Sequence, residues 1–136
     1  MTPGTEPDTT ADTYDVEIDV RLRDIDFMGH VNNATYATYL EQAREAYFRD
    51  VFDTSLADLD TVLAHLEINY KQPIEADATV SIALTVGEPG TASLPLTYEI
   101  YADESLAATA TTVQVFIDSS TGDSRPIPET WRSQLD

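Results

Sequence analysis

The segment that decides the fold covers residues 23–44 and reads RDIDFMGHVNNATYATYLEQAR. Before it, over residues 14–23, apolar and charged side chains alternate strictly, which is the period of a half-buried strand with one wet face. Beyond residue 33 the apolar side chains recur at helical spacing, so we expect one helix over about 34–52. Residues 24–33 are then the connection between a strand and the start of a long helix.

The predicted helix is amphipathic. Its apolar stripe is the expected buried face, and Arg44 is expected on another face together with other charged residues. Asn32 or Asn33 can cap it, because a short side-chain oxygen accepts from the free N–H groups of a first helical turn. The stripe consists of Tyr36, Tyr39, Leu40, Ala43, Tyr47 and Val51.

Four further alternating runs predict four more strands, over about 62–70, 78–86, 94–100 and 106–118. A strand, a long helix and four antiparallel strands make an α+β fold with one helix on one face of the sheet. Because one helix leaves edge strands and other surfaces open, we expect a homo-oligomer, either a homodimer or a homotetramer. The apolar positions of the first two runs are Val62, Ala64, Leu66, Ile68 and Tyr70, then Ala78, Val80, Ile82, Leu84 and Val86, and the last run carries Val113, Val115 and Ile117 on one face.

The remaining segments are expected to be connections. Residues 1–12 show no apolar periodicity and are interpreted as a disordered leader, which leaves 13–136 as a single domain. The stretch 53–60 is a connector in which Thr54 or Ser55 can cap a short helical turn.

The ionisable residues are strongly unbalanced, with 25 acidic against 7 basic side chains and a formal net charge of -18. No basic stripe is available for a phosphate backbone, so we expect no nucleic-acid partner, and an anionic membrane surface is equally disfavoured. The chain lacks Cys, which excludes disulfides, thiolate zinc sites and a cysteine nucleophile. No signal peptide or apolar run long enough for a membrane span is visible, so we expect a cytoplasmic protein.

The acidity has two interpretations. The carboxylates are spread through a chain that is 42% hydrophobic, which favours a folded core over a disordered acidic tail. One interpretation is a halophilic protein, since the Debye length falls to about 3 Å at 1 M salt and the self-repulsion is then screened. The other is ordinary solubility through surface charge. The near absence of lysine leads us to favour the first.

The residues that can carry chemistry are concentrated in segment 23–36. A helix start offers free backbone N–H groups and the positive end of the helix dipole, which can stabilise an oxyanion. A neighbouring carboxylate can activate water or attack as a nucleophile. From the residues alone, Asp26 can equally bind the N–H groups of its own loop. Asp24 and Asp26 can point apart, so no carboxylate dyad is predicted.

Two motifs carry a family resemblance. The pattern D-x-D-x-x-G-H-V-N-N-x-x-Y at 24–36, with LEINYKQPI at 66–74, resembles the hotdog-fold acyl-CoA thioesterases of the 4-hydroxybenzoyl-CoA thioesterase type. The resemblance extends over about residues 14–132. It implies a hotdog fold, in which a five-stranded antiparallel sheet wraps around one long central helix. It also implies hydrolysis of acyl-CoA or other pantetheine thioesters.

The resemblance places the catalytic acid at Asp26 and the N–H that polarises the thioester carbonyl on or near Asn33. The HVNN form is also similar to plant-type acyl-carrier-protein thioesterases, and this adds His30 as a catalytic candidate. Met28 stands where the pattern of that group has Asn. Some relatives use an acid on the central helix, for which Glu41 is the candidate here; a solvated helix residue is the alternative.

The same resemblance implies that an acyl-CoA binds in a groove at a subunit interface, with its acyl group beside the helix. The candidate substrate-binding residues are Gly29, Val31, Asn32, Tyr36 and Lys71. Lys71 can meet the phosphates of CoA, or it can simply extend into water from the end of its strand. Gly29 can adopt a backbone conformation closed to other residues.

No metal ion or redox cofactor is expected for this chemistry, and His65 stands on the polar side of its strand without further ligands at metal-binding spacing. Two other functions remain open. One is an enoyl-thioester hydratase or dehydratase, and the other is a protein that binds acyl thioesters without turnover.

Overall fold

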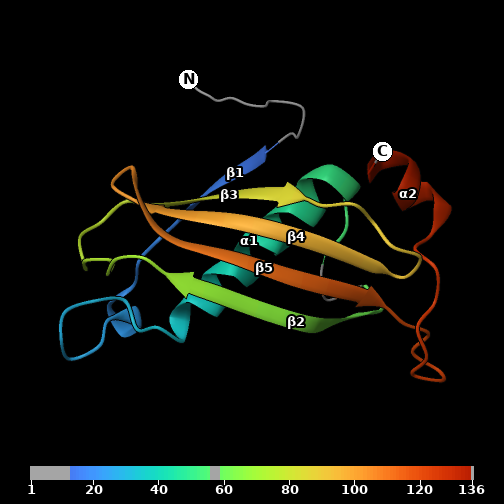
Figure 1. Cartoon of the computed structure of the whole chain (residues 1–136), viewed down its shortest axis with the longest axis horizontal. Helices are drawn as coiled ribbons and strands as arrows, with labels where there is room; N and C mark the ends of the chain where they lie inside the picture. Colours follow the sequence, from blue (N-terminus) through green and yellow to red (C-terminus); the bar gives the residue numbers. More distant parts are fainter. Residues whose placement is uncertain (1–12, 56–58, 136) are drawn as a thin grey trace.

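The computed structural model describes residues 13–55 and 59–135. The predicted leader and most of the predicted turn after Ser55 lie outside the described residues. The elements follow one another along the chain as Figure 1 shows. They are β1 (Thr13–Ile18), a 3₁₀ turn (Leu22–Asp24), α1 (Thr35–Phe52), β2 (Thr61–Tyr70), β3 (Val80–Val86), β4 (Ser93–Ala102), β5 (Ser105–Phe116) and α2 (Glu129–Leu135).

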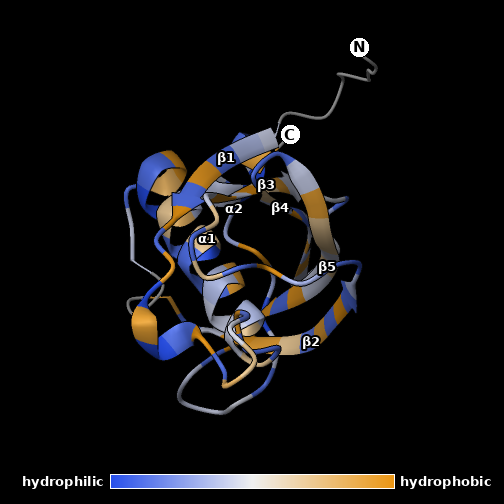
Figure 2. Ribbon diagram, turned by 90° about the vertical axis from the view of Figure 1, so that its left-hand side faces the viewer, coloured by the Kyte–Doolittle hydropathy of each residue, from blue (hydrophilic) through white to orange (hydrophobic). Residues whose placement is uncertain are grey.

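The five strands form one antiparallel sheet in the order β1-β3-β4-β5-β2. The sheet curls around α1, which lies on its concave side (Figure 2). The core is made by one face of the sheet and the buried side of the helix. The predicted α+β architecture, with a single long helix inside an antiparallel sheet, is confirmed. None of the helices in the described ranges is long and apolar enough to cross a membrane.

The first strand is shorter than the alternating pattern predicted. It ends at Ile18, whose register partner Val80 is the first residue of β3, so residues 19–23 have no strand to pair with. The chain instead turns through Leu22–Asp24, where the Arg21 N–H donates to Asp24 Oδ2 over 2.8 Å. Leu22 continues the apolar alternation and is nevertheless 91% exposed.

Helix α1 begins at Thr35, one residue after the predicted start, and ends at Phe52 as predicted. Asp53 closes it in the left-handed conformation at φ 56°, and its N–H donates to Arg49 O over 3.0 Å. Most of the predicted stripe is buried, although two positions near the C-terminus differ. Tyr36, Tyr39, Leu40 and Ala43 are buried, Tyr47 is half-buried and Val51 is exposed.

The expectation that Arg44 faces away from the core is wrong, since this residue is only 4% exposed. Its Nη1 donates to Tyr98 Oη over 3.3 Å, and that phenol shares a 2.6 Å hydrogen bond with Thr112 Oγ1. Burial is the main cause that raises the pKa of Tyr98. Periodicity could not predict this arrangement, because the partners of the guanidinium lie on β4 and β5.

Strand β2 forms one edge of the sheet. The prediction that Val62 and Ala64 belong to the same face as Leu66, Ile68 and Tyr70 is wrong. The register of β2 against β5 shifts between Leu63 and His65, which is a β-bulge with Ala64 as the extra residue. Leu63 pairs with Gln114 and Leu66 with Thr112, two buried residues of β5. Because directly opposite residues of an antiparallel pair share a face, Leu63 and Leu66 lie on the inner face.

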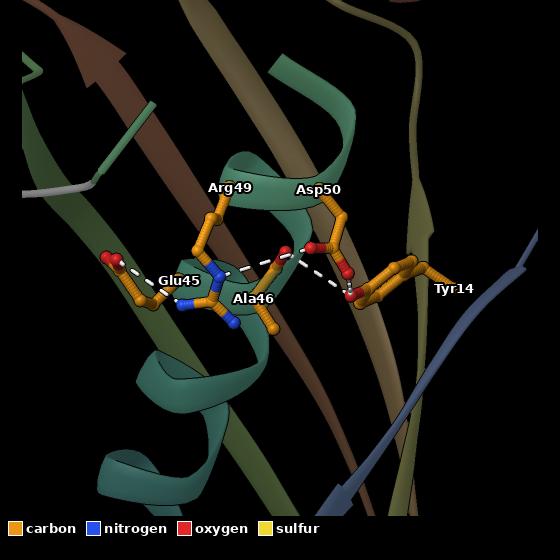
Figure 3. A network of polar contacts seen from close by, with 5 residues as sticks. All are labelled: Tyr14, Glu45, Ala46, Arg49 and Asp50. Atoms are coloured by element: carbon orange, nitrogen blue, oxygen red, sulfur yellow. Dashed lines mark hydrogen bonds and ion pairs between the residues drawn. The ribbon is translucent and has the colours of Figure 1, made fainter. Parts of the chain in front are cut away.

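Two further contacts fix the C-terminal half of α1. Trp131 of α2, a helix that the sequence analysis did not predict, stacks on Phe52 with a centroid distance of 4.0 Å. Figure 3 shows the contact with β1, in which the Tyr14 hydroxyl donates to the Asp50 carboxylate and lies 3.3 Å from Ala46 O. The C-terminal half of α1 is therefore joined to β1 by Tyr14 and to α2 by Trp131.

Candidate active site

The connection between β1 and α1 is a tight turn held by Asp26. Its Oδ1 accepts from the N–H of Met28 over 2.9 Å and from the N–H of His30 over 3.2 Å. The Gly29 N–H donates to Asp26 O over 3.0 Å, and Gly29 has φ 85°, which favours glycine. No described residue donates to the other carboxylate oxygen, Oδ2. The bonds from Asp26 to the N–H groups of its own loop, which the sequence left open as an alternative to catalysis, are therefore present. They occupy Oδ1 only.

The start of α1 follows directly. Asn32 Oδ1 accepts from the Ala34 N–H over 2.8 Å, and Asn32 O accepts from the Thr35 N–H over 2.9 Å. The prediction that Asn32 or Asn33 caps the helix is wrong, because the N-cap is Ala34 and has no side-chain cap bond; Asn32 instead closes the turn that precedes α1. The N–H of Asn33 meets no acceptor among the described residues, as is usual for a donor at a helix start.

A cavity of about 300 Å³ adjoins both features. Its walls come from the turn, from the start of α1 and from the end of β2 with the residues after it. It brings together most of the residues that the sequence analysis singled out. The lining residues are Asp26, His30, Val31, Asn33, Tyr36, Tyr70, Lys71, Gln72 and Pro73.

Glu75 pairs with His30 and was missed by the sequence analysis. The two side chains meet at 3.2 Å between Nε2 and Oε2, and the backbones of the two residues form an isolated β-bridge. The Val31 N–H also donates to Ile74 O over 2.9 Å, so the loop after β2 is joined to the turn that Asp26 holds. The position of Glu75 directly after the segment 66–74 is the one signal that could have drawn attention to it.

Tyr70 was missed as well, because it was counted among the apolar positions of its strand. Its hydroxyl donates to Asn33 O over 2.8 Å. Its ring meets the ring of Tyr36 edge to face, with a centroid distance of 4.9 Å and an interplanar angle of 74°. Burial, and secondarily the neighbouring Tyr70, raises the pKa of Tyr36.

Three of the candidates do not line this cavity. Gly29 and Asn32 are exposed and act on the backbone of the turn, as described above. Glu41 lines a separate cavity of about 660 Å³ between β1 and the flank of α1, together with Glu17, Glu45 and Arg49.

Asp24 and Asp26 bind different groups. Asp24 Oδ2 accepts from the hydroxyl of Tyr39 over 2.7 Å, and this bond, second to burial, raises the pKa of Tyr39. The two carboxylates therefore have separate hydrogen-bond partners. His65 contacts Glu67 at 3.6 Å on the other face of β2. Within residues 13–55 and 59–135, no cluster of three or more potential ligands could hold a metal ion.

The sequence matches the Thioesterase-like superfamily over residues 20–135, and the chain belongs to this family. A search of curated proteins gave no significant match.

Solved structures share the fold. A thioesterase from Thermus thermophilus, complexed with coenzyme A and Zn, is 33% identical with a TM-score of 0.82, over 89% of this chain and 90% of that one. A predicted thioesterase from Bacillus stearothermophilus is 26% identical with a TM-score of 0.84, over 91% and 94%. A 1,4-dihydroxy-2-naphthoyl-CoA thioesterase from Synechocystis is 24% identical with a TM-score of 0.83, over 91% and 96%, and at that identity shows the fold alone. The hotdog fold is thereby confirmed, and thioester hydrolysis is supported in general terms.

Proposed function

We propose that this protein hydrolyses acyl-CoA, or thioesters of another pantetheine carrier, to the free acid and the thiol. The observation that carries the proposal is the placement of Asp26 and Asn33 on one cavity at the start of α1. Membership of the thioesterase family supports it, as does the similar thioesterase that was solved with coenzyme A.

The reaction divides between these two residues. The carboxylate of Asp26 removes a proton from water while the oxygen attacks the thioester carbon, or it attacks that carbon itself. The Asn33 N–H donates to the oxyanion that forms. When Asp26 acts as the base, the C–S bond then breaks and the thiolate takes up the proton that Asp26 removed from water. When Asp26 attacks as the nucleophile, the C–S bond breaks to leave a mixed anhydride on Asp26, the thiolate takes a proton from solvent, and water then hydrolyses the anhydride to the free acid. His30 shares the cavity and is the second group available for proton transfer.

Other residues that line the cavity bind the substrate. Val31 and Tyr36 are buried and give the acyl group an apolar contact, whereas Lys71 is exposed and can meet a CoA phosphate. A net charge of -18 repels CoA, and molar salt screens that repulsion. Glu41 lines the separate cavity, so we assign it no step in this mechanism.

The functional unit that we propose is a homodimer formed through β2, whether alone or within a tetramer. On the inner face of this edge strand, Leu63 and Leu66 are 42% and 41% exposed. An edge strand leaves a row of backbone groups unpaired, and a second copy can satisfy them while covering the leucines. Tyr70 ends the same strand, Lys71 follows it directly, and both line the cavity, so the second copy would lie next to the active site.

A panel of acyl-CoA thioesters tests the activity. Thiol release is measured with a chromogenic disulfide for straight-chain, branched and aromatic acyl groups, in dilute buffer and in molar KCl. We expect turnover with at least one acyl group, and faster turnover in salt. Addition of water to crotonyl-CoA with the thioester intact would instead indicate a hydratase. Tight binding with no thiol release across the panel would indicate a binding protein.

A further inference from the structure

An N–H group stabilises an oxyanion well only when its direction is fixed before the charge develops. The N–H of Asn33 belongs to the peptide group that joins Asn32 to Asn33. The carbonyl of that peptide accepts from the Thr35 N–H over 2.9 Å, a bond within the same turn. The next peptide group, between Asn33 and Ala34, must also be held if the turn is to keep its shape.

This second peptide is bonded at both ends. The Ala34 N–H donates to Asn32 Oδ1 over 2.8 Å. The carbonyl of Asn33 accepts from the Tyr70 hydroxyl over 2.8 Å and, at 3.4 Å, from the Tyr36 N–H. Among the described residues, Tyr70 is the one group outside segment 32–36 that bonds either peptide.

The support for Tyr70 is itself fixed. Tyr70 pairs with Ala108 of β5, and the N–H groups of the next two residues, Lys71 and Gln72, both donate to Ala107 O over 2.8 and 3.1 Å. The ring packs edge to face on Tyr36, which is fully buried. The end of β2 therefore positions the hydroxyl of Tyr70 next to the start of α1.

We propose that Tyr70 is a positioning residue for the oxyanion donor: it holds the turn that leads into α1 so that the Asn33 N–H points into the cavity. This inference rests on the proposed thioesterase function. A phenol has one O–H, and that of Tyr70 is already committed to Asn33 O, so Tyr70 acts through the backbone and gives no proton to the leaving thiolate.

The test compares Tyr70→Phe with Tyr101→Phe, which removes a hydroxyl bound to Glu99 Oε1 over 2.9 Å on β4. Deleting a whole oxyanion donor costs about 100-fold or more in kcat, so its misalignment in Tyr70→Phe should cost roughly tenfold. The KM should stay within about twofold, because the ring that lines the cavity remains. Tyr101→Phe should match the wild type.

A spectroscopic measurement separates positioning from a general loss of structure. In an Asp26→Asn background, an acyl-CoA carrying a ¹³C carbonyl is bound and its C=O stretch is recorded by infrared difference spectroscopy. Polarisation by the Asn33 N–H lowers the frequency, and adding Tyr70→Phe should return it towards the value in water. Circular dichroism on both variants checks that the fold is retained.

The inference is overturned if Tyr70→Phe keeps the wild-type kcat, if KM changes alone, or if the carbonyl frequency does not move. These results leave the proposed function standing so long as the wild type hydrolyses acyl-CoA. If neither the wild type nor Tyr101→Phe releases thiol, the proposed function itself is contradicted.

Discussion

The backbone and side chain of Asp26 are both bonded to the backbone of His30. The Asp26 N–H donates to His30 O over 2.8 Å, and Asp26 Oδ1 accepts from the His30 N–H over 3.2 Å. This pair of bonds fixes the carboxylate in the wall of the cavity. The imidazole of His30 extends from the same closed turn to the carboxylate of Glu75. The carboxylate of Asp26 and the imidazole of His30 are therefore held in fixed positions relative to the start of α1.

The pairing of His30 with Glu75 predicts a kinetic effect for Glu75→Gln. The substitution keeps the size of the side chain and removes the charge opposite Nε2, so the imidazole is held less firmly. Both side chains are partly exposed, and such pairs are individually weak, so we expect kcat/KM to fall by only about three- to tenfold. Steady-state hydrolysis of the best acyl-CoA measures it.

The chain offers a matched control in Glu67→Gln. Glu67 contacts His65 at 3.6 Å on β2, away from the cavity, so the same chemical change should leave kcat/KM unchanged. An equal loss in both variants would mean that the charge of the protein, and not the contact with His30, sets the rate.

Dimerisation through β2 is tested by Leu66→Asp. A carboxylate on the exposed inner face of the edge strand would be buried without a partner in the dimer, which costs several kcal/mol. We expect the variant to elute as a monomer in light-scattering chromatography, while the wild type is a dimer or a tetramer. Leu22→Asp makes the same change at a leucine outside the sheet and should keep the wild-type mass. A wild-type mass for Leu66→Asp would exclude this interface.

The sequence predicted those parts of the fold and site that local patterns encode. The helix was predicted because Tyr36, Tyr39 and Leu40 repeat with the period of an α-helix, and all three are buried. Asp26, His30 and Asn33 were found because they are neighbours in the chain. Local patterns could not reveal contacts made across the fold.

Three of the misses have such a contact as their cause. Tyr70 and Glu75 join the site from the end of β2 and the following loop, through bonds to Asn33 and His30. Arg44 has the spacing of a surface residue, and its burial depends on a phenol of β4. In β2, one bulge residue shifts which side chains face the core, and the alternating pattern of the sequence does not reveal that bulge.

Tyr14 predicts a loss of stability at high pH. Burial, and then the hydrogen bond to Asp50 shown in Figure 3, raises the pKa of Tyr14 from its usual 10.0 to about 12. Above pH 10 the unfolded chain releases this proton while the folded chain keeps it. The contribution of Tyr14 to the free energy of unfolding should therefore be fully present below about pH 10 and be lost between about pH 10 and 12. In Tyr14→Phe the fall measured by urea unfolding should be shallower, and equal slopes would contradict the assignment.

Salt should stabilise the fold. With 25 acidic against 7 basic side chains, self-repulsion opposes the compact state, and screening removes it. We expect the thermal midpoint to keep rising between about 0.1 M and about 2 M KCl, where the Debye length falls from about 10 Å to below 3 Å. A midpoint that is already at its maximum in dilute buffer would contradict the halophilic interpretation and favour ordinary solubility.

The role of Asp26 is the central claim, and Asp26→Asn tests it most directly. The amide keeps an oxygen for the N–H groups of Met28 and His30 and removes the base, so the fold should persist. Asp24→Asn is the matched control, because Asp24 binds Tyr39 and does not line the cavity. Measured on the best acyl-CoA in molar KCl, kcat should fall at least about 100-fold in Asp26→Asn and stay close to the wild type in Asp24→Asn. Hydrolysis by Asp26→Asn at the wild-type rate would contradict the account.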